Sequence, residues 1–427
     1  MKVHFIGIGG IGVSALAKYY LIQGHQVSGS DLVSSEITDT FKKLGAKIII
    51  GKHKSKNLST DTDLVIYSPA VQKSNPELLK AKSYKLNAKS YPEALGELTK
   101  KYFTIAICGS HGKSTVAAMI GILLTKAKLD PTVIVGTKLK EFGDSNCRVG
   151  KSQYLVIEAD EHMASFLNYW PKIIVLTNIE ADHLDYYKNI GNIKKAFNEF
   201  ISHLPKDGIL ITHKSVDKKA LPKLKRILKV PGAHNSYNAS LALAVGRVLK
   251  IPDQVSFKAL SEYKGAWRRF EEHDLRFKNV KLKIISDYGH HPTQIRVTLE
   301  AAREKFPQNR IWCVYQPHQY QRTYYLFKDF VKVFKKAATQ KWVDKLIITD
   351  IYDVAGRENK KIKKKVNSQK LIKAINKSNV IYLPKEKIIN YLKNNLEGEE
   401  VVIIMGAGDI YNLTLALINF GNKKIKK

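Results

Sequence analysis

Short apolar runs alternate with longer helical patterns along this 427-residue chain. The runs are rich in β-branched and aromatic residues, and most of them end at a cluster of Gly or polar residues. Such alternation predicts parallel strands joined by crossover helices. The predicted strands are Val3 to Ile8, Gln26 to Ser28, a strand near Ile48, Leu64 to Tyr67, Phe103 to Ile107, Tyr154 to Ile157, Lys172 to Leu176, Ile209 to Thr212, Leu282 to Ile285, Ile311 to Tyr315, Lys345 to Ile348, Val380 to Tyr382 and Val401 to Met405.

These elements form three α/β blocks in series, which we place at residues 1–98, 99–267 and 268–427. Helices are predicted from Gly12 to Ile22, from Val116 to Leu124 and, near the end of the chain, from Ile410 to Asn419. Ligands of open parallel sheets bind beyond the carboxyl ends of the strands. The polar clusters at those ends are therefore where we expect the chemistry.

One of these clusters is a Gly-rich turn, Gly109-Ser110-His111-Gly112-Lys113-Ser114-Thr115, between a predicted strand and a predicted helix. A turn of this kind directs backbone N–H groups at a phosphate. Lys113 would reach the β- and γ-phosphates of a nucleotide, and the Ser114 hydroxyl would hold Mg²⁺. The common spacing would need a Gly at Ile107, so this loop is a shorter G-x-x-G-K-S form. The alternative is a plain turn with an exposed Lys.

A second Gly-rich loop, Gly7-Ile8-Gly9-Gly10-Ile11-Gly12, follows the first predicted strand. Asp31 comes about 20 residues later, after the second strand, as in dinucleotide-binding folds. Any ligand with a diphosphate and a ribose fits this pattern, including a UDP-sugar. The loop alone leaves NAD and UDP-sugars as alternatives.

Acidic residues follow the next two strands of the second block. Glu158-Ala159-Asp160-Glu161 would place carboxylates near Mg²⁺ and the γ-phosphate, and the segment from Asn178 to Asp185 contains His183. His183 is a candidate second Mg²⁺ ligand, although Mg²⁺ usually prefers oxygen. The alternative is a hydrogen-bonded loop histidine.

Three further polar segments are candidates for contacts with a ligand, but each of them also has a purely structural interpretation. Gly232 to Ala239 opens a helix, where Asn and His also serve as caps. Ser286 to Thr293 contains two adjacent His before Pro292, which also suits a helix entry. In Gln316 to Thr323, Arg322 suits a carboxylate by bidentate geometry, or a surface ion pair.

Composition narrows the class of protein. The net charge of +33 raises nucleic-acid binding, but Lys predominates along the whole chain and no nucleic-acid motif occurs. We expect the charge to attract anionic substrates instead. No run of about 18 apolar residues and no signal-peptide pattern occur, and three scattered Cys fit a reducing cytoplasm, where we place the protein.

Nine segments together resemble the Mur ligase family, in the family's own order. They are GIGGIG with SGSD, GSHGKST, EADE with ASFL, TNIEADHLD, GAHNSYNA, RRFE, DYGHHPT, QPHQYQRT and MGAGDIY. The resemblance implies an N-terminal Rossmann-like domain for a UDP-sugar, a central P-loop ATPase domain with a mainly parallel sheet, and a C-terminal Rossmann-like domain that presents the amino acid.

The resemblance also implies an activity, ATP-dependent amide-bond formation between UDP-N-acetylmuramate and L-alanine for peptidoglycan synthesis. The muramate carboxylate would attack the γ-phosphate, giving an acyl phosphate and ADP, and the alanine amine would then displace phosphate. Mg²⁺ would offset charge repulsion between the carboxylate and the triphosphate. Partners would be the two substrates, with no nucleic acid and no membrane, in a monomer or dimer.

Carried over residue by residue, the resemblance assigns four groups of binding residues and a catalytic set. Gly9, Gly10, Ile11 and Gly12 would face the diphosphate of the UDP-sugar, with Ser30 and Asp31 at its nucleoside. ATP would be held by Gly109, Ser110, His111, Gly112, Lys113, Ser114, Thr115, Asn235, Asn238, Arg269 and Asp287, with His234 also at the adenine side. The metal ligands would be Ser114, Glu158 and His183. His290, His291, His318 and Arg322 would line the acceptor site, and Lys113, Glu158, His183 and His290 form the catalytic set.

Several departures from the family pattern bear on specificity. His162 and Met163 stand where the family usually has Ser-Asp, and Gln319 stands where it usually has Arg. The segment between Ile209 and Pro231 is short, so a small antiparallel subdomain is expected to be missing. The Lys that other members carbamylate would fall near Phe197, and no Lys stands at that position, which favours the alanine-adding branch. The alternatives are a ligase that attaches recycled murein peptides and a non-catalytic nucleotide-sugar-binding protein.

Overall fold

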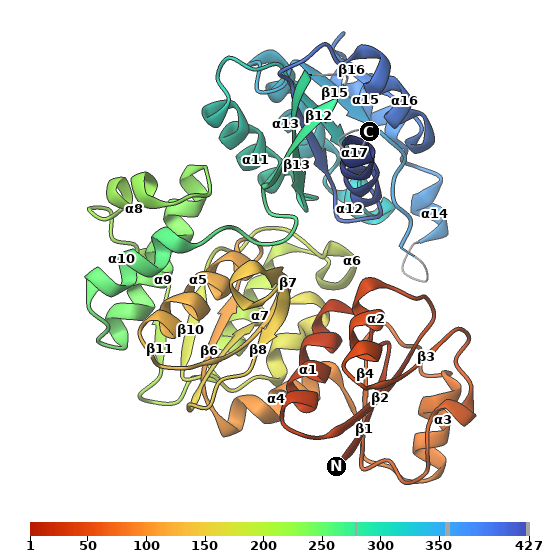
Figure 1. Cartoon of the computed structure of the whole chain (residues 1–427), viewed down its shortest axis with the longest axis vertical. Coiled ribbons are helices and arrows are strands. Elements are labelled where there is room, and N and C mark those ends of the chain that lie inside the picture. The colour runs from red at the N-terminus through yellow and green to blue at the C-terminus, as the bar shows by residue number, and fades with distance from the viewer. Residues whose placement is uncertain (278–279, 355–358, 424–427) are drawn as a thin grey trace. The chain divides into compact units, whose positions relative to one another are not determined.

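The computed structural model describes residues 1–277, 280–354 and 359–423, and it divides into two compact units (Figure 1). The first unit comprises Met1–Glu180, Gly191–Ile227 and Asn238–Lys264. The second comprises Ala181–Ile190, Leu228–Tyr237 and the chain from Gly265 onward. Two sheets lie in the first unit and one in the second, so the predicted α/β fold with three sheets is confirmed.

The first sheet has the strand order β3-β2-β1-β4-β5, and all of its pairs are parallel. Its elements are β1 (Lys2–Ile6), α1 (Ile11–Ile22), β2 (Gln26–Asp31), α2 (Glu36–Lys43), β3 (Lys47–Ile50), η1 (Ser55–Asn57), β4 (Leu64–Tyr67), α3 (Pro76–Ser83), β5 (Ala88–Ser90) and α4 (Tyr91–Lys101). Helix α1 is buried on most sides because it contacts β1 and β2 and also β7 and β8 of the second sheet. This double packing explains why its sequence lacks a polar face.

The second sheet has the order β11-β10-β6-β9-β7-β8, in which β8 alone runs antiparallel. Its elements are β6 (Phe103–Cys108), α5 (Lys113–Lys126), β7 (Thr132–Leu139), η2 (Lys140–Phe142), β8 (Ser145–Arg148), β9 (Tyr154–Glu158), η3 (His162–Asn168), β10 (Ile173–Leu176), α6 (Leu184–Tyr187), α7 (Ile190–Ile201), β11 (Ile209–Ile211), η4 (His213–Ser215), α8 (Leu221–Ile227), α9 (Ala233–Val248) and α10 (Asp253–Glu262). Residues 212–231 form η4 and α8 rather than strands, as their short length predicted.

The third sheet has the order β12-β13-β17-β14-β15-β16, with β12 antiparallel at one edge. Its elements are β12 (Glu271–Phe277), β13 (Val280–Asp287), α11 (Pro292–Lys305), β14 (Ile311–Tyr315), α12 (Tyr320–Tyr325), α13 (Phe327–Thr339), β15 (Lys345–Ile348), α14 (Lys360–Lys363), α15 (Ser368–Ile375), β16 (Val380–Tyr382), α16 (Lys385–Asn395), β17 (Val401–Met405) and α17 (Tyr411–Lys423). Successive residues of each central strand enter opposite cores: Cys313 packs in the core with α11, α13 and α15, whereas Val314 packs with α16 and α17. Burial on both faces explains why these strands are continuous apolar runs.

Every predicted strand has a counterpart in the structure, with ends that differ by a few residues. Strands β5, β7, β8 and β12 were not predicted. The proposed boundary at residue 98 falls inside α4, and residues 181–190 and 228–237 belong to the unit of the third sheet. No helix in the described part of the chain is long and apolar enough to cross a bilayer.

Candidate functional site

The Gly-rich turn between β6 and α5 has a backbone that only Gly can adopt at two positions. Gly109 has φ +130°, and a Cβ there would lie 2.1 Å from Thr177 Oγ1. Gly112 has φ +86°, and a Cβ there would lie 2.8 Å from Asn238 Oδ1. The turn thus packs directly on the loop after β10, and the predicted ATP residue Asn238 lies beside it. The structure brings these residues together as the sequence predicted.

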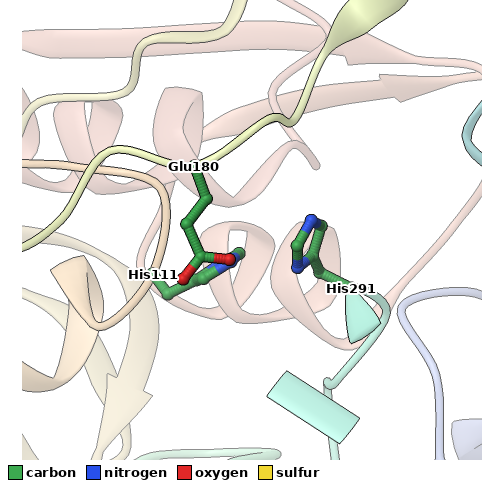
Figure 2. Close-up of side chains that lie close together, drawn as sticks. All are labelled: His111, Glu180 and His291. Atoms are coloured by element: carbon green, nitrogen blue, oxygen red, sulfur yellow. The ribbon is translucent and has the colours of Figure 1, made fainter. Parts of the chain in front are cut away.

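The loop after β10 fixes the shape of this turn. The backbone N–H groups of Ser110 and His111 donate to Asn178 O and Asn178 Oδ1, both at 3.0 Å, and Thr177 Oγ1 donates to His111 O at 2.7 Å. Figure 2 shows the His111 ring beside the Glu180 carboxylate, with Nε2 and Oε2 3.4 Å apart. Since Ser110 and His111 already donate within the protein, the free N–H groups for a phosphate are those of the first turn of α5.

Lys113 lies at the start of α5 among three carboxylates, with 11% of its side chain exposed. Its Nζ donates to Glu161 Oε2 at 2.6 Å and to Gly109 O at 2.7 Å, and Asp160 Oδ1 lies 3.7 Å away. Burial lowers the Lys113 pKa, but Glu161, Asp160 and Glu158 together raise it above its ordinary value. Lys113 therefore carries a full positive charge at neutral pH. Sequence analysis placed Glu161, which is 2% exposed, in an acidic segment near the metal but did not predict its pairing with Lys113.

Ser114 and Glu158 form a pair of oxygen groups next to Lys113. The Ser114 hydroxyl donates to Glu158 Oε1 at 2.9 Å, and the Gly136 N–H donates to Oε2 at 2.8 Å. Strands β6 and β9 are neighbours in the sheet, so their carboxyl ends bring these side chains together. Hydroxyl and carboxylate oxygens are the donor set that Mg²⁺ prefers, and the pair fits this ion. His183 belongs to the other unit and remains a predicted ligand.

The first Gly-rich loop is tied to the end of β2. The N–H groups of Gly7 and Ile8 donate to Ser30 O, at 2.8 and 3.2 Å, and the Gly9 N–H donates to Asp31 Oδ2 at 2.8 Å. Gly10 precedes the first turn of α1, which begins at Ile11. At Gly12 a Cβ would lie 3.0 Å from the Tyr91 ring. The residues predicted for a diphosphate and a nucleoside therefore lie together at the carboxyl ends of β1 and β2.

In the second unit, Arg322 forms an ion pair, as its structural alternative predicted, but the pair is buried and does not lie at the surface. Its Nε donates to Asp182 Oδ1 at 3.0 Å, and Nη1 lies 3.1 Å from His318 Nδ1. Burial opposes both charges, but each partner stabilises the other: the Asp182 pKa lies well below its ordinary value and the Arg322 pKa is raised. A small pocket beside the pair is lined by residues of α6 and α12 and the turns before them.

The predicted acceptor-site histidines lie near this pair. The rings of His290 and His318 are 6.0 Å apart, and burial together with the Arg322 charge lowers the His290 pKa well below its ordinary value. The backbone N–H of His183 donates to Asp182 Oδ1 at 2.7 Å. His291 caps α11 through Nδ1, which accepts from Thr293 N at 3.3 Å, so the structural alternative for this residue also holds.

Three other predicted ATP residues lie in the second unit. Backbone groups hold Asp287 and Asn235, and an aromatic ring packs against Arg269. Asp287 accepts from the N–H groups of Phe270 and Gly289, both at 2.8 Å, and burial raises its pKa. Asn235 Nδ2 donates to Pro231 O at 2.7 Å. The Arg269 guanidinium packs over the Tyr288 ring at 4.8 Å.

Two more residues lie near these ATP candidates: His234 is half-buried and Arg268 is buried. Burial lowers the pKa of His234 to about 4. Arg268, which sequence analysis did not assign, lies over the rings of Trp267, Tyr288 and Tyr411 and donates to Gly408 O at 3.2 Å. Arg268 and Arg269 are adjacent in the sequence, and no local pattern indicates which of the two side chains is buried.

Sequence profiles of one family match most of the chain. The profile described as Mur ligase family, catalytic domain, matches residues 2–103; that of the Mur ligase middle domain matches residues 107–230; and that of the Mur ligase, glutamate ligase domain, matches residues 268–408.

Curated relatives and solved structures agree with the profiles. The UDP-N-acetylmuramate–L-alanine ligase of Acetivibrio thermocellus is 39% identical, covering 96% of this chain and 94% of the relative, and that of Alkaliphilus metalliredigens is 38% identical, covering 97% and 96%. The crystal structure of the UDP-N-acetylmuramate-alanine ligase of Thermotoga maritima matches with a TM-score of 0.80 and 26% identity, over 99% of this chain and all of the other. A murein peptide ligase of Psychrobacter arcticus has a TM-score of 0.70 at 21% identity, which establishes a shared fold alone.

Proposed function

Because this chain belongs to the Mur ligase family, we propose that it joins L-alanine to UDP-N-acetylmuramate in an ATP-dependent reaction of peptidoglycan synthesis. The observation that carries the proposal is the cluster of Lys113, Ser114 and Glu158 at the carboxyl ends of β6 and β9. This cluster occurs in a chain whose alignment covers 94% and 96% of two relatives named UDP-N-acetylmuramate–L-alanine ligase.

The reaction consists of two displacements. The muramate carboxylate attacks the γ-phosphorus of ATP, forming an acyl phosphate and releasing ADP. The amine of L-alanine then attacks the acyl carbon, and the tetrahedral intermediate collapses to the amide as inorganic phosphate leaves and the amine loses a proton. Phosphorylation is required because a free carboxylate has no adequate leaving group.

Lys113 stabilises the charge that develops on the transferred phosphoryl group. Its ammonium is desolvated and fixed, so it needs little reorganisation when the transition state forms. Glu161 and Asp160 neutralise this charge in the structure. ATP must therefore compete with these carboxylates, and Lys113 must exchange at least part of its contact with Glu161 for phosphate oxygens.

Ser114 and Glu158 would hold Mg²⁺. When bound, the ion neutralises phosphate charge and lets the anionic carboxylate approach. The Gly136 N–H orients the Glu158 carboxylate toward Ser114, so the oxygen pair is preorganised. The proposal also includes His183 as a metal ligand, together with a second metal ion.

For the amino acid, we propose that Arg322 recognises the carboxylate. Asp182 and His318 hold the guanidinium at Nε and Nη1, and since Nη2 has no hydrogen-bond partner within the described residues, it can donate to a substrate oxygen. Gln319 stands where the family usually carries a second cation, so charge recognition rests mainly on Arg322. A cytoplasmic monomer or dimer without a nucleic-acid partner also remains a proposal.

The test is ADP release by the purified full chain with ATP, Mg²⁺ and UDP-N-acetylmuramate, across the twenty amino acids and a murein tripeptide. We expect release that needs both UDP-N-acetylmuramate and an amino acid, with L-alanine as the best acceptor. Release with the tripeptide but not with alanine would instead support the peptide-attaching alternative. UDP-sugar binding with no turnover would support the non-catalytic one.

A further inference from the structure

The second unit contains a buried cation that the proposed mechanism does not use. Arg268 is 8% exposed, and its guanidinium lies 5.7 Å from the ring centroid of Trp267, 4.9 Å from that of Tyr288 and 5.1 Å from that of Tyr411. Trp267 Nε1 donates to the Tyr411 hydroxyl at 2.9 Å, which joins two of these side chains. An aromatic face attracts a cation within about 6 Å, most strongly where water is excluded. The three rings therefore form an aromatic cage around Arg268.

Backbone carbonyls, and no carboxylate, contact the caged guanidinium in the part of the chain that the structure describes. Nη2 donates to the carbonyl oxygens of Gly406 and Gly408, the latter at 3.2 Å, whereas Nε is buried without a hydrogen-bond partner. Burial lowers the pKa of Arg268 from its ordinary value of 12.5, yet a guanidinium keeps its charge in proteins. A buried charge without a counter-charge is unfavourable, so an apolar side chain would suit a purely structural contact better. Arg268 therefore calls for a role beyond packing.

The backbone on either side of Arg269 adopts a conformation that side chains disfavour. Arg268 and Phe270 have φ +56° and +50°, in the left-handed region. The Arg268 N–H donates to Glu271 Oε2 at 3.0 Å, and the Tyr288 N–H donates to Arg268 O at 2.7 Å. Such conformations persist only where surrounding contacts impose them, and they cluster at ligand sites. The contacts of Arg268 thus help to fix the backbone that carries Arg269.

Arg269 itself has an unpaired guanidinium. Its side chain is half-buried and lies over the Tyr288 ring at 4.8 Å, and among the described residues it has no hydrogen bond or ion pair. Arg268 lies over the same ring, so two cations share one aromatic partner. Their repulsion contributes to the lowered pKa of Arg268. An anionic ligand on Arg269 would offset this repulsion.

We propose that Arg268 is a positioning residue for Arg269: its caged guanidinium ties residues 267–270 to the loop after β17 and so holds Arg269 ready to donate to an oxygen of the ATP phosphates. Arg268 touches no ligand and acts through the shared backbone and the Tyr288 ring. Holding Arg269 in place before ATP binds reduces the entropy lost on binding. The inference rests on the proposed function, because it takes Arg269 as a contact of ATP.

The test is a double-mutant cycle on the full chain, with calorimetric affinity for the β,γ-imido analogue of ATP. We expect Arg269→Met to weaken binding at least about tenfold, the range of one charge-assisted hydrogen bond, and Arg268→Met to weaken it about 3- to 10-fold. The double variant should bind no more than about twofold weaker than Arg269→Met, because Arg268 acts through Arg269. Additive losses would overturn the inference.

Adenosine, measured as a competitor of the analogue, separates positioning from general damage to the site. It carries no phosphate, so its affinity for Arg268→Met should stay within about twofold of the wild-type value. In turnover, the KM for ATP should rise while the KM for UDP-N-acetylmuramate stays unchanged. Equal losses of adenosine and analogue affinity in Arg268→Met would assign this residue to the fold alone and overturn the inference.

Arg303→Met is the matched control. Arg303 is another arginine of this unit that donates to backbone carbonyls, those of Lys341 and Asn309, both at 2.8 Å, but it is also paired with Asp344 at 2.7 Å. Its replacement should lower the Tm and leave the ratio of analogue to adenosine affinity unchanged. A ratio that falls as far as in Arg268→Met would overturn the inference.

Tyr411→Leu keeps the test valid if Arg268→Met does not fold, because it opens one wall of the cage and retains both arginines. It should weaken analogue binding about threefold, the range of one cation–π contact, but not in the Arg269→Met background. Equal weakening in both backgrounds would overturn the inference. If the wild type binds no analogue at all, the proposed function itself fails. If it binds the analogue and Arg269→Met binds equally well, the inference alone fails.

Discussion

Replacing Lys113 separates the structural role of this residue from its catalytic role. Lys113→Met removes the cation that faces Glu161, a carboxylate that is 2% exposed. Breaking one side of a buried ion pair costs about 3–5 kcal/mol, because a desolvated charge is left behind. For a unit of this size that is roughly a 5–15 °C fall in Tm. Neutralising the acid as well, in Lys113→Met/Glu161→Gln, should restore most of the lost stability.

Activity should not recover with stability. The double variant lacks the ammonium that would face the γ-phosphate, so ADP release should stay at least about 10²-fold below wild type, equivalent to about 2.7 kcal/mol of transition-state stabilisation. Calorimetric melting and a coupled ADP assay would each be carried out on four proteins: the wild type, both variants and Glu161→Gln. Turnover by Lys113→Met/Glu161→Gln within about tenfold of wild type would refute the phosphate-loop assignment. A Lys113→Met protein as stable as wild type would refute the ion-pair argument.

Three further predictions concern other parts of the chain. Arg322→Ala should raise the KM for the amino acid at least about tenfold and leave the KM for ATP nearly unchanged; an unchanged amino-acid KM would place the carboxylate elsewhere. Gly109→Ala should abolish ATP binding in a calorimetric titration, because its Cβ would collide with Thr177 Oγ1; normal ATP affinity would contradict the loop geometry. Glu77 is a buried carboxylate whose four side-chain hydrogen bonds outweigh burial and lower its pKa from 4.5 to about 2. Ionised Glu77 should contribute about 3 kcal/mol to the free energy of unfolding above pH 4.5, and this contribution should be lost as the pH falls toward 2. The difference in Tm between the wild type and Glu77→Gln should therefore narrow between pH 4.5 and pH 2; a constant difference would contradict the prediction.

The sequence predicted most of the strands that are buried on both faces, because such strands are apolar runs, but it missed the interior strand β7 (Thr132–Leu139). It did not predict β8 (Ser145–Arg148) or β12 (Glu271–Phe277), whose sequences are largely polar. Both are antiparallel strands at sheet edges, where one side of the backbone is unpaired and polar residues are tolerated. Local pattern carries little information about an element whose burial is decided by distant neighbours.

The same limit applies to the site. The motifs identified Lys113, Ser114 and Glu158 because each follows a strand in a recognisable spacing. They did not identify Glu161 as the partner of Lys113, because 48 residues separate the two and their contact depends on β6 lying beside β9. Glu77 gave no signal either, since an acidic residue in the first turn of a helix is usually an exposed cap. Only the fold shows that this carboxylate is buried.

The most direct test of the acyl-phosphate reaction uses UDP-N-acetylmuramate labelled with ¹⁸O in the muramate carboxylate. The wild-type chain would turn it over with ATP and L-alanine, and mass spectrometry would follow the label. Attack of the carboxylate on the γ-phosphate carries one labelled oxygen into inorganic phosphate and leaves the other in the new amide. Label recovered in AMP, or phosphate without label, would contradict this mechanism.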